Sequence, residues 1–516
     1  MISARFLLAL KLITLIFFLF VFAYKTATFV DPDLGWHLRA GEIVAQMGQA
    51  PMIDPWNYVI NDQEWIDHEW LLDLFLWNAW IKGYWPIALL LFFLFAFSPI
   101  VTWILRTRSS LQLLFVAVGA SVIWPIIGVR PQALSFLFFF ILYELLVSEW
   151  SIKIRKIAFF FLPILFALWA NLHAGFVAGL AFWVIVFFIQ LYEKIRATKF
   201  TFRYLVNIES ASLLFSFIAT LFTPYHLTLW REIITSTTSP LIAYVAEWQM
   251  PLSRLDVPLI IFLGAGAALI FASRKMLPLR EVIPMIFFFV SYMQHARMAP
   301  FFFITALPPI QRTLVLLSNN TQILIKELPS PHKHLIVLAP SLLLLAMLAY
   351  NGTSSMLREP YEPPYEAIRA VQSIPHESCN VFNDYGFGGW MIFENPNAKV
   401  FIDGRSPHWK AEDGTSPFAD YVELIKKPDT WNTVFEKHHI CIVILASELD
   451  NEYANDISKT PSLWMNTFTK LANLFYPSPS HAQLSATLKD AGWCTVYSDS
   501  KAIILLKPGS PLCAYK

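Results

Sequence analysis

Acidic and histidine side chains gather in one short stretch near the start of the chain. The set comprises Asp31, Asp33, His37, Asp54, Asp67, His68 and Glu69. A carboxylate held beside a hydroxyl group accepts its proton when the oxygen attacks a substrate. Pro32 fixes the backbone between the first two acids, so that a carboxylate projects where an apolar run ends. We therefore interpret Asp33 as a general base, with Asp31 second. Further catalytic candidates are His68 and Glu69.

Two other interpretations of this stretch stay open. Asp33 and Glu69 could instead bind a divalent cation, because carboxylate oxygens are the ligands that Mg²⁺ and Mn²⁺ prefer. No cofactor is certain, and the cation is an alternative to direct base catalysis. Asp33 could also act only as the cap of a short helix expected to begin near Trp36, because a carboxylate satisfies the first backbone amides of a helix.

Polar residues also stand at the ends of later apolar runs. Arg130 and Arg297 suit a phosphate group, because a guanidinium binds it through two hydrogen bonds and stays charged. We expect these residues to line one cavity at a single membrane face, although each taken alone is typical of an interfacial or capping residue. The substrate-binding candidates are His37, Arg130, His173, Tyr225, Glu247 and Arg297.

A secondary set of candidates lies in the C-terminal part of the chain. Asp384 belongs to the segment NDYGFGGW, and Asp403 and Arg405 flank a glycine. Glycines let a ligand approach the backbone, and this acid–arginine pair could bind a sugar hydroxyl. The same residues could instead form a tight turn with a buried ion pair. The segment lacks the lysine and the spacing of a phosphate-binding loop.

The composition indicates which elements must position these residues. Of 516 residues, 56% are hydrophobic and only 15% are charged, whereas soluble globular proteins carry about 25% charged residues. The net charge of +1 gives no indication of a nucleic-acid partner. Apolar runs long enough to cross a bilayer must be helices, because backbone amides cannot stay unpaired in lipid. About 11 spans are expected: 5–24, 86–105, 111–129, 131–148, 157–172, 174–192, 208–223, 257–273, 281–296, 298–316 and 335–350.

Basic residues and cysteines indicate the orientation of the chain. Loops rich in Lys and Arg alternate with poorer ones, and the rich loops are expected in the cytoplasm. The N-terminus is then cytoplasmic, its apolar run is an uncleaved helix rather than a signal peptide, and an odd number of spans exports the C-terminus. All four cysteines lie in this exported part, which suits an oxidising compartment, and three pairings are possible. They are Cys379, Cys441, Cys494 and Cys513.

The sequence predicts a polytopic α-helical membrane protein with a C-terminal extracytoplasmic α/β domain. We place the membrane domain at 1–350, including an outer loop at 25–85, and the α/β domain at 351–516. Amphipathic helices are expected in the outer loop at 37–47 and 68–82, and the tryptophans of the second suit the membrane interface. In the α/β domain, apolar runs alternate with helical stretches at 363–373, 418–437 and 481–491, and a hairpin is expected at 493–506.

The motifs resemble those of a known family. DPDLGWHLRAGEIV, W-x-x-HEWLLDL, RPQALSF, ANLHAGFVAGL, ARMAPFF, NDYGFGGW and FIDGR are similar to segments of polytopic bacterial membrane proteins in the glycosyltransferase C (GT-C) superfamily. This class includes protein O-mannosyltransferases and lipid A aminoarabinose transferases. The resemblance implies a polyprenyl-phosphate sugar donor and an acidic base or metal ligand in the first outer loop, carried over to Asp33 and then Asp31. In the mannosyltransferases the two acids are adjacent, whereas Pro32 separates them here.

These features together predict a cell-envelope glycosyltransferase of the bacterial inner membrane. It would move a hexosyl or pentosyl group from a polyprenyl-phosphate donor to a glycan, lipid or protein acceptor at the periplasmic or extracellular face. One alternative is a transporter or flippase of lipid-linked glycans, which needs polar groups within the membrane, and Glu144 is the main example. The other alternative is a non-catalytic membrane protein whose C-terminal domain binds a glycan or an assembly partner.

Overall fold

The computed structural model is mostly helical and divides into two compact units. It describes residues 4–515 except 61–62, 124–125, 149, 198–206, 250–263, 265, 268–270, 272–276, 328–338, 347–361, 376–378, 406, 412 and 448–480. The first unit comprises 1–29, 86–226 and 255–360, and the second comprises 30–85, 227–254 and 361–516. Most of the predicted outer loop therefore belongs to the same unit as the C-terminal residues. The expected boundary at 350/351 lies outside the described residues and stays a prediction.

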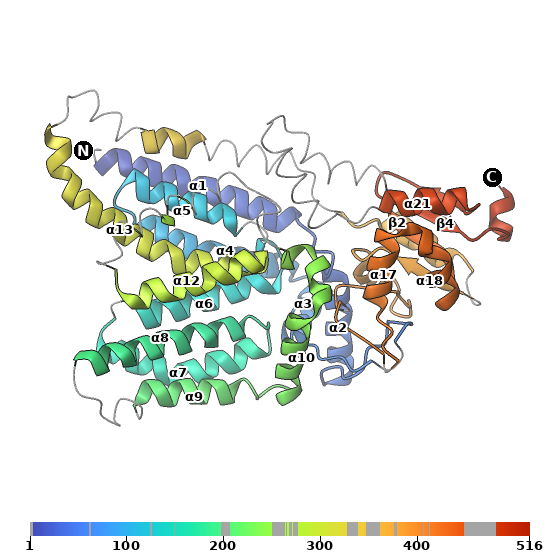
Figure 1. The fold of residues 1–516 in the computed structure, drawn as a ribbon, viewed down its shortest axis with the longest axis horizontal. Helices are drawn as coiled ribbons and strands as arrows, with labels where there is room; N and C mark the ends of the chain where they lie inside the picture. Colours follow the sequence, from blue (N-terminus) through green and yellow to red (C-terminus); the bar gives the residue numbers. More distant parts are fainter. Residues whose placement is uncertain are drawn as a thin grey trace. The chain divides into compact units, whose positions relative to one another are not determined.

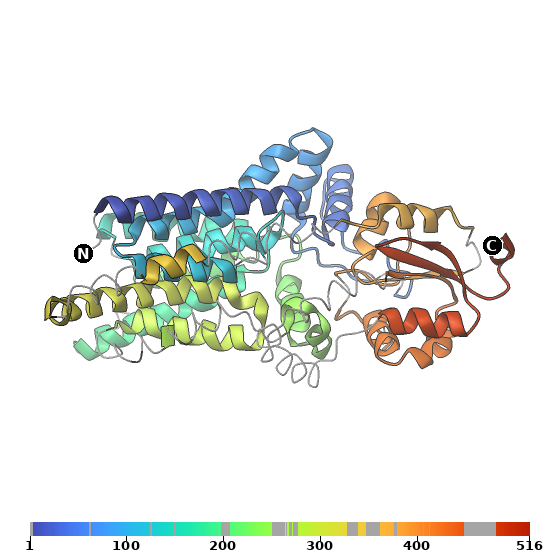
Figure 2. The same cartoon turned by 90° about the horizontal axis from the view of Figure 1, so that it is seen from above.

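Long apolar helices build the first unit, and both views show them running alongside one another (Figures 1 and 2). They are α1 (Ala4–Thr28), α4 (Trp85–Arg106), α5 (Ser110–Val122), α6 (Pro131–Val147), α7 (Ile152–Ala170), α8 (Phe176–Ala197), α9 (Ile208–Ala219), α12 (Leu279–Gln294) and α13 (Ala299–Glu327). Aromatic side chains join them: the ring of Phe139 lies 5.0 Å from Phe182, 5.1 Å from Phe288 and 4.8 Å from Phe301.

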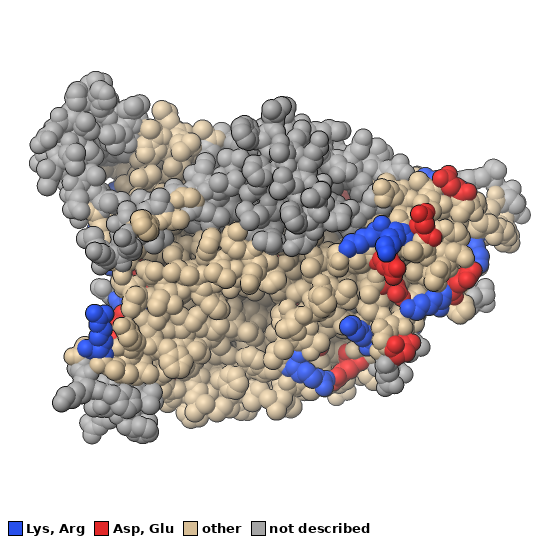
Figure 3. Space-filling model, viewed as in Figure 1, with Lys and Arg blue, Asp and Glu red and all other residues tan. Residues whose placement is uncertain are grey.

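Within the described residues, four helices are long and apolar enough to cross a membrane. They are Ala4–Thr28, Trp85–Arg106, Phe176–Ala197 and Ala296–Leu316, and they match the expected spans 5–24, 86–105, 174–192 and 298–316. The helices at 110–120, 131–147 and 208–219 are apolar but shorter. Most of the expected spans 257–273 and 335–350 lies outside the described residues. Figure 3 shows a broad surface over the helices with few charged side chains, as contact with lipid requires.

The second unit contains a four-stranded mixed sheet in the order β1-β2-β4-β3. Strands β1 (Asn380–Asn383) and β2 (Ile440–Ala446) are parallel, and β4 (Ala502–Leu506) pairs antiparallel with β2 and with β3 (Cys494–Ser498). The β3–β4 pair is the hairpin expected at 493–506. Figure 2 shows helices on both faces of this sheet, as expected for an α/β domain.

Short helices complete the second unit. They are α2 (Leu34–Met47), α3 (Trp70–Ile81), α10 (Leu227–Thr238), η3 (Pro240–Tyr244), η4 (Ala246–Trp248), α15 (Tyr365–Ser373), α16 (Gly388–Glu394), α17 (Pro417–Lys426), η7 (Pro428–Thr430), α18 (Trp431–Lys437), α21 (His481–Asp490) and η8 (Pro511–Tyr515). The helices expected at 37–47 and 68–82 correspond to α2 and α3. The helical stretch expected at 418–437 is present as α17, η7 and α18. α17 ends before Pro428, because proline has no amide hydrogen for the helix and disfavours helical geometry in the residue before it.

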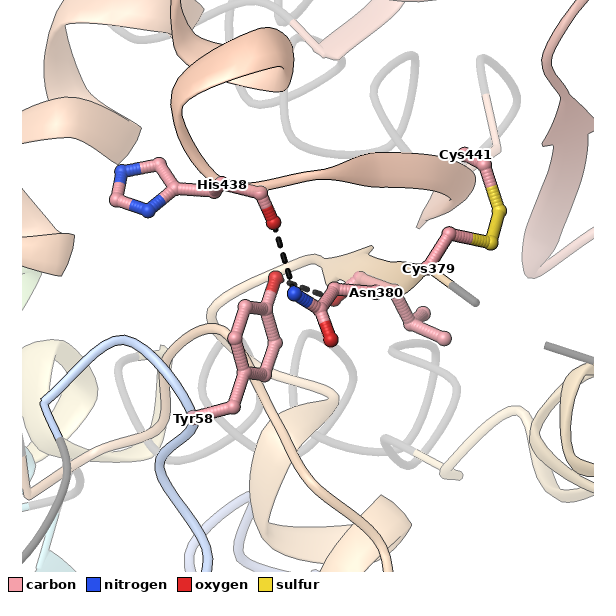
Figure 4. Close-up of a disulfide and its surroundings, with 6 residues drawn as sticks. Tyr58, Cys379, Asn380, His438 and Cys441 are labelled. Carbon is pink, nitrogen blue, oxygen red and sulfur yellow. Dashed lines mark hydrogen bonds between the residues drawn. A yellow bond between two sulfur atoms is a disulfide. The ribbon is translucent and has the colours of Figure 1, made fainter. Parts of the chain in front are cut away.

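Two disulfides settle the pairing that the sequence left open. Cys379 bonds Cys441, and Cys494 bonds Cys513, so no cysteine is free. Figure 4 shows the first bond, which joins the residue before β1 to the second residue of β2. Both disulfides lie in the second unit, in agreement with an extracytoplasmic location for this part of the chain.

Candidate functional site

Asp33 lies immediately before α2, with its carboxylate packed against the backbone of Gly404. A Cβ atom added to Gly404 would lie 2.0 Å from Oδ1 and 2.7 Å from Oδ2 of Asp33. Asp33 occupies the cap position of α2, but its side chain makes no capping hydrogen bond. Helix capping therefore does not explain this carboxylate. The turn is instead held by Asp31, whose Oδ1 accepts the backbone N–H of Asp33 at 2.9 Å.

Glycines bring α2 and α16 into backbone contact beside Asp33. A Cβ atom on Gly35 would lie 2.3 Å from the carbonyl oxygen of Gly389, and one on Gly389 would lie 2.7 Å from that of Pro32. The indole N–H of Trp390 donates to the carbonyl oxygen of Asp31 at 3.2 Å. The segments DPDLGW, NDYGFGGW and DGR are therefore neighbours, and the glycines serve close packing between elements.

Arg405 forms a buried ion pair beneath this contact. Its Nε and Nη2 atoms donate to Asp403 at 2.9 and 2.7 Å, and Nη1 donates to Asp54 at 2.8 Å. Burial lowers the pKa of Arg405, but the charges of the two carboxylates outweigh it and raise the pKa overall. The buried ion pair, one of the two alternatives for Asp403 and Arg405, is present.

Four tryptophan rings surround the Arg405 guanidinium. Its central carbon lies 4.6–5.8 Å from the ring centroids of Trp36, Trp56, Trp65 and Trp409. A guanidinium over an aromatic face is attracted by the ring quadrupole, and the attraction strengthens where water is excluded. The arginine therefore joins the first outer loop to the DGR segment. Sequence reasoning counted Asp54 among the acids of the outer loop but predicted neither its pair with Arg405 nor this aromatic enclosure.

His37 and Glu69 lie together, in contact with a residue that sequence reasoning missed. His37 Nδ1 lies 2.7 Å from Asp73 Oδ1, and His37 Nε2 lies 3.6 Å from Glu69 Oε2. Glu69 also lies 3.6 Å from His68. The side chain of Asp73 is completely buried. The sequence does contain a signal for this residue. Asp73 is the one acidic residue in the largely apolar helix α3, and a buried charge requires a partner.

Asp67 and Asp73 form a buried acid pair next to His37. Burial raises the pKa of both carboxyl groups, and the charge of Asp73 raises that of Asp67 further. The two carboxyl groups therefore titrate as a coupled pair, and both hold their protons to higher pH than exposed carboxyl groups do.

The proposed cation ligands do not form a metal centre with other residues. Among the described residues, no group of three His, Cys, Asp or Glu side chains is placed to hold a metal ion. Glu69 contacts His37 and His68, while Asp33 rests against Gly404. No step below passes through a cation. The Mg²⁺ or Mn²⁺ alternative stays a prediction.

Asp384 lies where the parallel strands β1 and β2 end. Its Oδ1 accepts the backbone N–H of Gly386 at 3.0 Å, and its Oδ2 lies 3.2 Å from His481 Nε2. The same imidazole nitrogen lies 2.7 Å from the hydroxyl oxygen of Tyr421. Burial, and then the charge of Asp384, raise the pKa of Tyr421. Sequence reasoning identified Asp384 but neither of its partners.

A second polar cluster belongs to the first unit. Ser135 of α6 lies 2.6 Å from His173 Nδ1 and accepts the indole N–H of Trp169 at 2.7 Å. Arg297 Nη2 lies 3.5 Å from His173 Nε2. Arg130 precedes α6, and its guanidinium lies 5.5 Å from the ring centroid of Phe29. His173 and Arg297, predicted as neighbours in a substrate site, are therefore in contact.

The remaining candidates divide between the units. Tyr225 is buried in the first unit, and Glu247 lies in η4 of the second. Arg130, His173 and Arg297 also belong to the first unit, whereas the acids of the outer loop and of the C-terminal part belong to the second. The single cavity expected to unite all of them stays a prediction.

Comparison with known proteins identifies a fold. No protein-family model and no curated protein matches the chain. The archaeal oligosaccharyltransferase AglB from Archaeoglobus fulgidus, solved with an inhibitory peptide and a dolichol-phosphate, is 12% identical at TM-score 0.50, covering 92% of this chain and 73% of that one. The A. fulgidus oligosaccharyltransferase tethered to an acceptor peptide is 11% identical at TM-score 0.51, covering 91% and 72%. At this identity the likeness concerns the fold alone: the fold of this chain is similar to that of the A. fulgidus oligosaccharyltransferase over nine tenths of its length.

Proposed function

We propose that this protein is a membrane glycosyltransferase that moves a sugar from a polyprenyl-phosphate-linked donor to an acceptor at the outer membrane face. The observation that carries the proposal is the fold, which is similar over 92% of the chain to an oligosaccharyltransferase solved with a dolichol-phosphate. The side chains of both units add chemical support. Such a transfer needs a carboxylate that accepts a proton and N–H groups that donate to a phosphate. The first outer loop supplies a carboxylate, and the helical unit supplies N–H groups.

Asp33 acts as the base in this proposal. The acceptor hydroxyl attacks the anomeric carbon of the sugar, and its proton passes to the Asp33 carboxylate. As the new carbon–oxygen bond forms, the bond between the anomeric carbon and the phosphate oxygen breaks, and the lipid phosphate leaves with the electron pair. Attack opposite the leaving group inverts the anomeric configuration. Asp33 suits this role because it is half-buried and tightly packed but is not used as a helix cap.

Arginines of the first unit stabilise the leaving phosphate. Arg130 and Arg297 are candidates, because fixed guanidinium groups stabilise negative charge that develops as the glycosidic bond breaks. The acceptor is a glycan, lipid or protein, and the fold does not distinguish these classes. The buried set of His37, Asp73 and Glu69 shapes α2, which follows Asp33, and so positions the base.

The flippase alternative requires charged groups within the helices. The main example, Glu144, is paired with an arginine. Glu144 of α6 forms a bidentate pair with Arg106, the last residue of α4, at 2.6 and 2.9 Å. A paired carboxylate at a helix end joins two helices and offers no polar path for a glycan. The contact therefore favours the transferase over the flippase.

The test is transfer by the full-length chain in lipid nanodiscs. Replacing Asp33 with Asn keeps the shape of the side chain but removes the base, so transfer from a polyprenyl-phosphate sugar should fall at least about 100-fold. The matched control is Asp490→Asn, an exposed acid at the end of α21. Unchanged transfer by the Asp33 variant would refute its role as base. Absence of transfer by the unmodified chain from hexosyl and pentosyl donors would refute the transferase itself.

A further inference from the structure

We propose that a cavity at the amino-terminal end of β1 is a binding site for a neutral saccharide. The cavity has a volume of about 400 Å³ and lies within the second unit, and this volume is typical of small-molecule sites in proteins. Its lining comes from the end of α15, the start of β1, the end of α16 with the segment after it, and the turn before β2. None of the candidate site residues lines it. The inference goes beyond the proposed function, because binding in this cavity requires no transfer.

The cavity lies at the opposite end of the parallel strands from Asp384. Two of its lining residues mark this end: Asn380 is the first residue of β1, and His439 directly precedes β2. Asp384 directly follows the last residue of β1. A strand advances about 3.3 Å per residue, so Asn380 and Asp384 are about 13 Å apart along β1. The cavity is therefore a site of its own rather than an extension of the polar cluster around Asp384.

Amide side chains supply most of the polar lining. Each carries both N–H donors and a carbonyl acceptor, and the four are Gln372, Asn380, Asn395 and Asn397. The amide nitrogen of Asn380 donates to the carbonyl oxygen of His438 at 2.8 Å (Figure 4), which leaves Oδ1 of Asn380 for a ligand. The side-chain oxygen of Asn395 accepts the backbone N–H of Asn397 at 3.0 Å, which leaves the Nδ2 hydrogens of Asn395 for a ligand. A sugar hydroxyl both donates and accepts, so such a mixture of acceptors and donors suits a saccharide.

The charge of the lining favours an uncharged ligand. Among the described residues that line the cavity there is no Asp, Glu or Arg, and the one Lys is Lys399. Its ammonium donates to the carbonyl oxygen of Pro55 at 2.6 Å, and Pro55 is not a lining residue. A divalent cation prefers carboxylate oxygens, and a phosphate is bound most strongly by the paired hydrogen bonds of an arginine. The lining offers neither, whereas its amides suit a neutral polar ligand.

Apolar side chains and a disulfide complete the wall of the cavity. Val371 and Met391 line it and are buried, with exposed fractions of 0% and 2%. A pyranose ring carries C–H groups on its faces and hydroxyls at its rim, so a wall of apolar and amide side chains matches it. Because separate segments converge on one hollow, the shape suits a compact ring better than an extended peptide. The bond between Cys379 and Cys441 ties the start of β1 to β2 beside the cavity, and a preformed site loses less entropy on binding.

The experiment measures binding to the full-length chain in nanodiscs by ligand-observed NMR. The probes are glucose, mannose, N-acetylglucosamine and short linear oligomers of each, with a neutral peptide in a second arm, and at least one saccharide should bind. Asn395→Asp keeps the oxygen that accepts the N–H of Asn397 but removes the amide donor, so it should weaken saccharide binding at least about tenfold. Ala398→Phe places a ring in the cavity and should weaken binding by at least the same factor. The matched control is Asn432→Asp, the same change at an exposed amide of α18 outside the lining, and its affinity should stay within about twofold.

Equal affinity of the Asn395→Asp variant and the control, or no saccharide binding by the unmodified chain, would overturn the site. Binding of the peptide in place of the saccharides would overturn the class of ligand. Thermal melting shows whether each variant is folded, and the nearly isosteric Asn395→Asp keeps the test decisive if Ala398→Phe unfolds the second unit. Asp33→Asn should bind the saccharide normally although it loses transfer, so failure of this inference and failure of the transferase proposal give different results. A saccharide whose binding is lost in Asp33→Asn but kept in Asn395→Asp would occupy the transfer site and refute the inference.

Discussion

Buried charge determines the properties of individual residues in the second unit. The carboxylates of Asp54 and Asp403 are buried, and both form ion pairs with Arg405. Without that guanidinium, the negative charge of neither carboxylate would be balanced. Removing one partner of a buried ion pair costs more than the pair contributes, because the remaining charge stays buried. Arg369 offers a comparison in the same unit, since its pair with Glu394 leaves 66% of its own side chain exposed.

Arg405→Met should therefore destabilise the second unit by about 3–5 kcal/mol, because it leaves two buried carboxylates without a countercharge. The control Arg369→Gln should leave the free energy of unfolding nearly unchanged, since water screens an exposed pair. Tryptophan fluorescence reports the denaturant unfolding of both variants, because four tryptophans surround Arg405. Similar losses in the two variants would contradict a structural role for the buried arginine.

The acid pair gives the second unit a defined response to pH. The pKa of Asp67 in the folded protein is raised well above its ordinary value, first by burial and then by Asp73. At pH values between the ordinary pKa of Asp67 and its raised pKa in the folded protein, the unfolded chain binds fewer protons than the folded one. The free energy of unfolding therefore falls as pH rises. The stabilisation that Asp67 gives the folded state is fully present at pH values below its ordinary pKa and is lost as the pH rises through its pKa in the folded protein.

Asp67→Asn keeps a hydrogen-bond donor toward Asp73 but cannot lose a proton. The unmodified protein should therefore lose melting temperature toward alkaline pH more steeply than this variant does. Melting curves measured at intervals from acidic to alkaline pH give the two slopes. Parallel slopes would show that Asp67 does not titrate in this range.

At the scale of elements, α2 and α16 depend on glycines separated by more than 350 residues. Gly35→Ala would drive a methyl group to 2.3 Å from the carbonyl oxygen of Gly389, and such overpacking costs about 1–3 kcal/mol. Gly386→Ala is the matched control, because the nearest atom to its added Cβ is 3.8 Å away. Thermal melting should separate the two variants. Transfer activity should also fall in the Gly35 variant, since Asp33 lies in the turn that the contact holds.

Periodicity and proline placement predict the elements but not their partners. The residues of α2, α3 and the β3–β4 hairpin follow from apolar spacing, because each element needs only local contacts to form. The contact of Gly35 with Gly389 has no local signal, since glycines in both segments equally suit turns or ligand approach. Asp403 and Arg405 left two alternatives open for the same reason: Asp54, which completes their ion pair, lies 351 positions from Arg405.

The candidate site shows the same limit at the scale of the whole molecule. The resemblance predicted Asp33 as the base, and polar clusters at helix ends predicted His173 and Arg297 as substrate-binding residues. Sequence reasoning did not predict Ser135, which lies 2.6 Å from His173 Nδ1. The sequence also predicts the presence of membrane spans better than it predicts their number, because helices such as α6, with 17 residues, are apolar yet short.

The two disulfides test the organisation of the whole chain, since they form only where the second unit meets an oxidising compartment. Cys379 and Cys441 are 62 positions apart, whereas Cys494 and Cys513 are 19 apart. A bond that closes a longer loop removes more entropy from the unfolded chain, giving about 4 kcal/mol for the first and about 3 kcal/mol for the second. Replacing Cys379 and Cys441 with serine should therefore lower the melting temperature more than replacing the other pair.

In intact cells, a membrane-impermeant maleimide should label these cysteines only after reduction. Labelling without a reductant would show free thiols and contradict the two disulfides, whereas protection after reduction would place the second unit on the cytoplasmic side and with it remove Asp33 from the outer face.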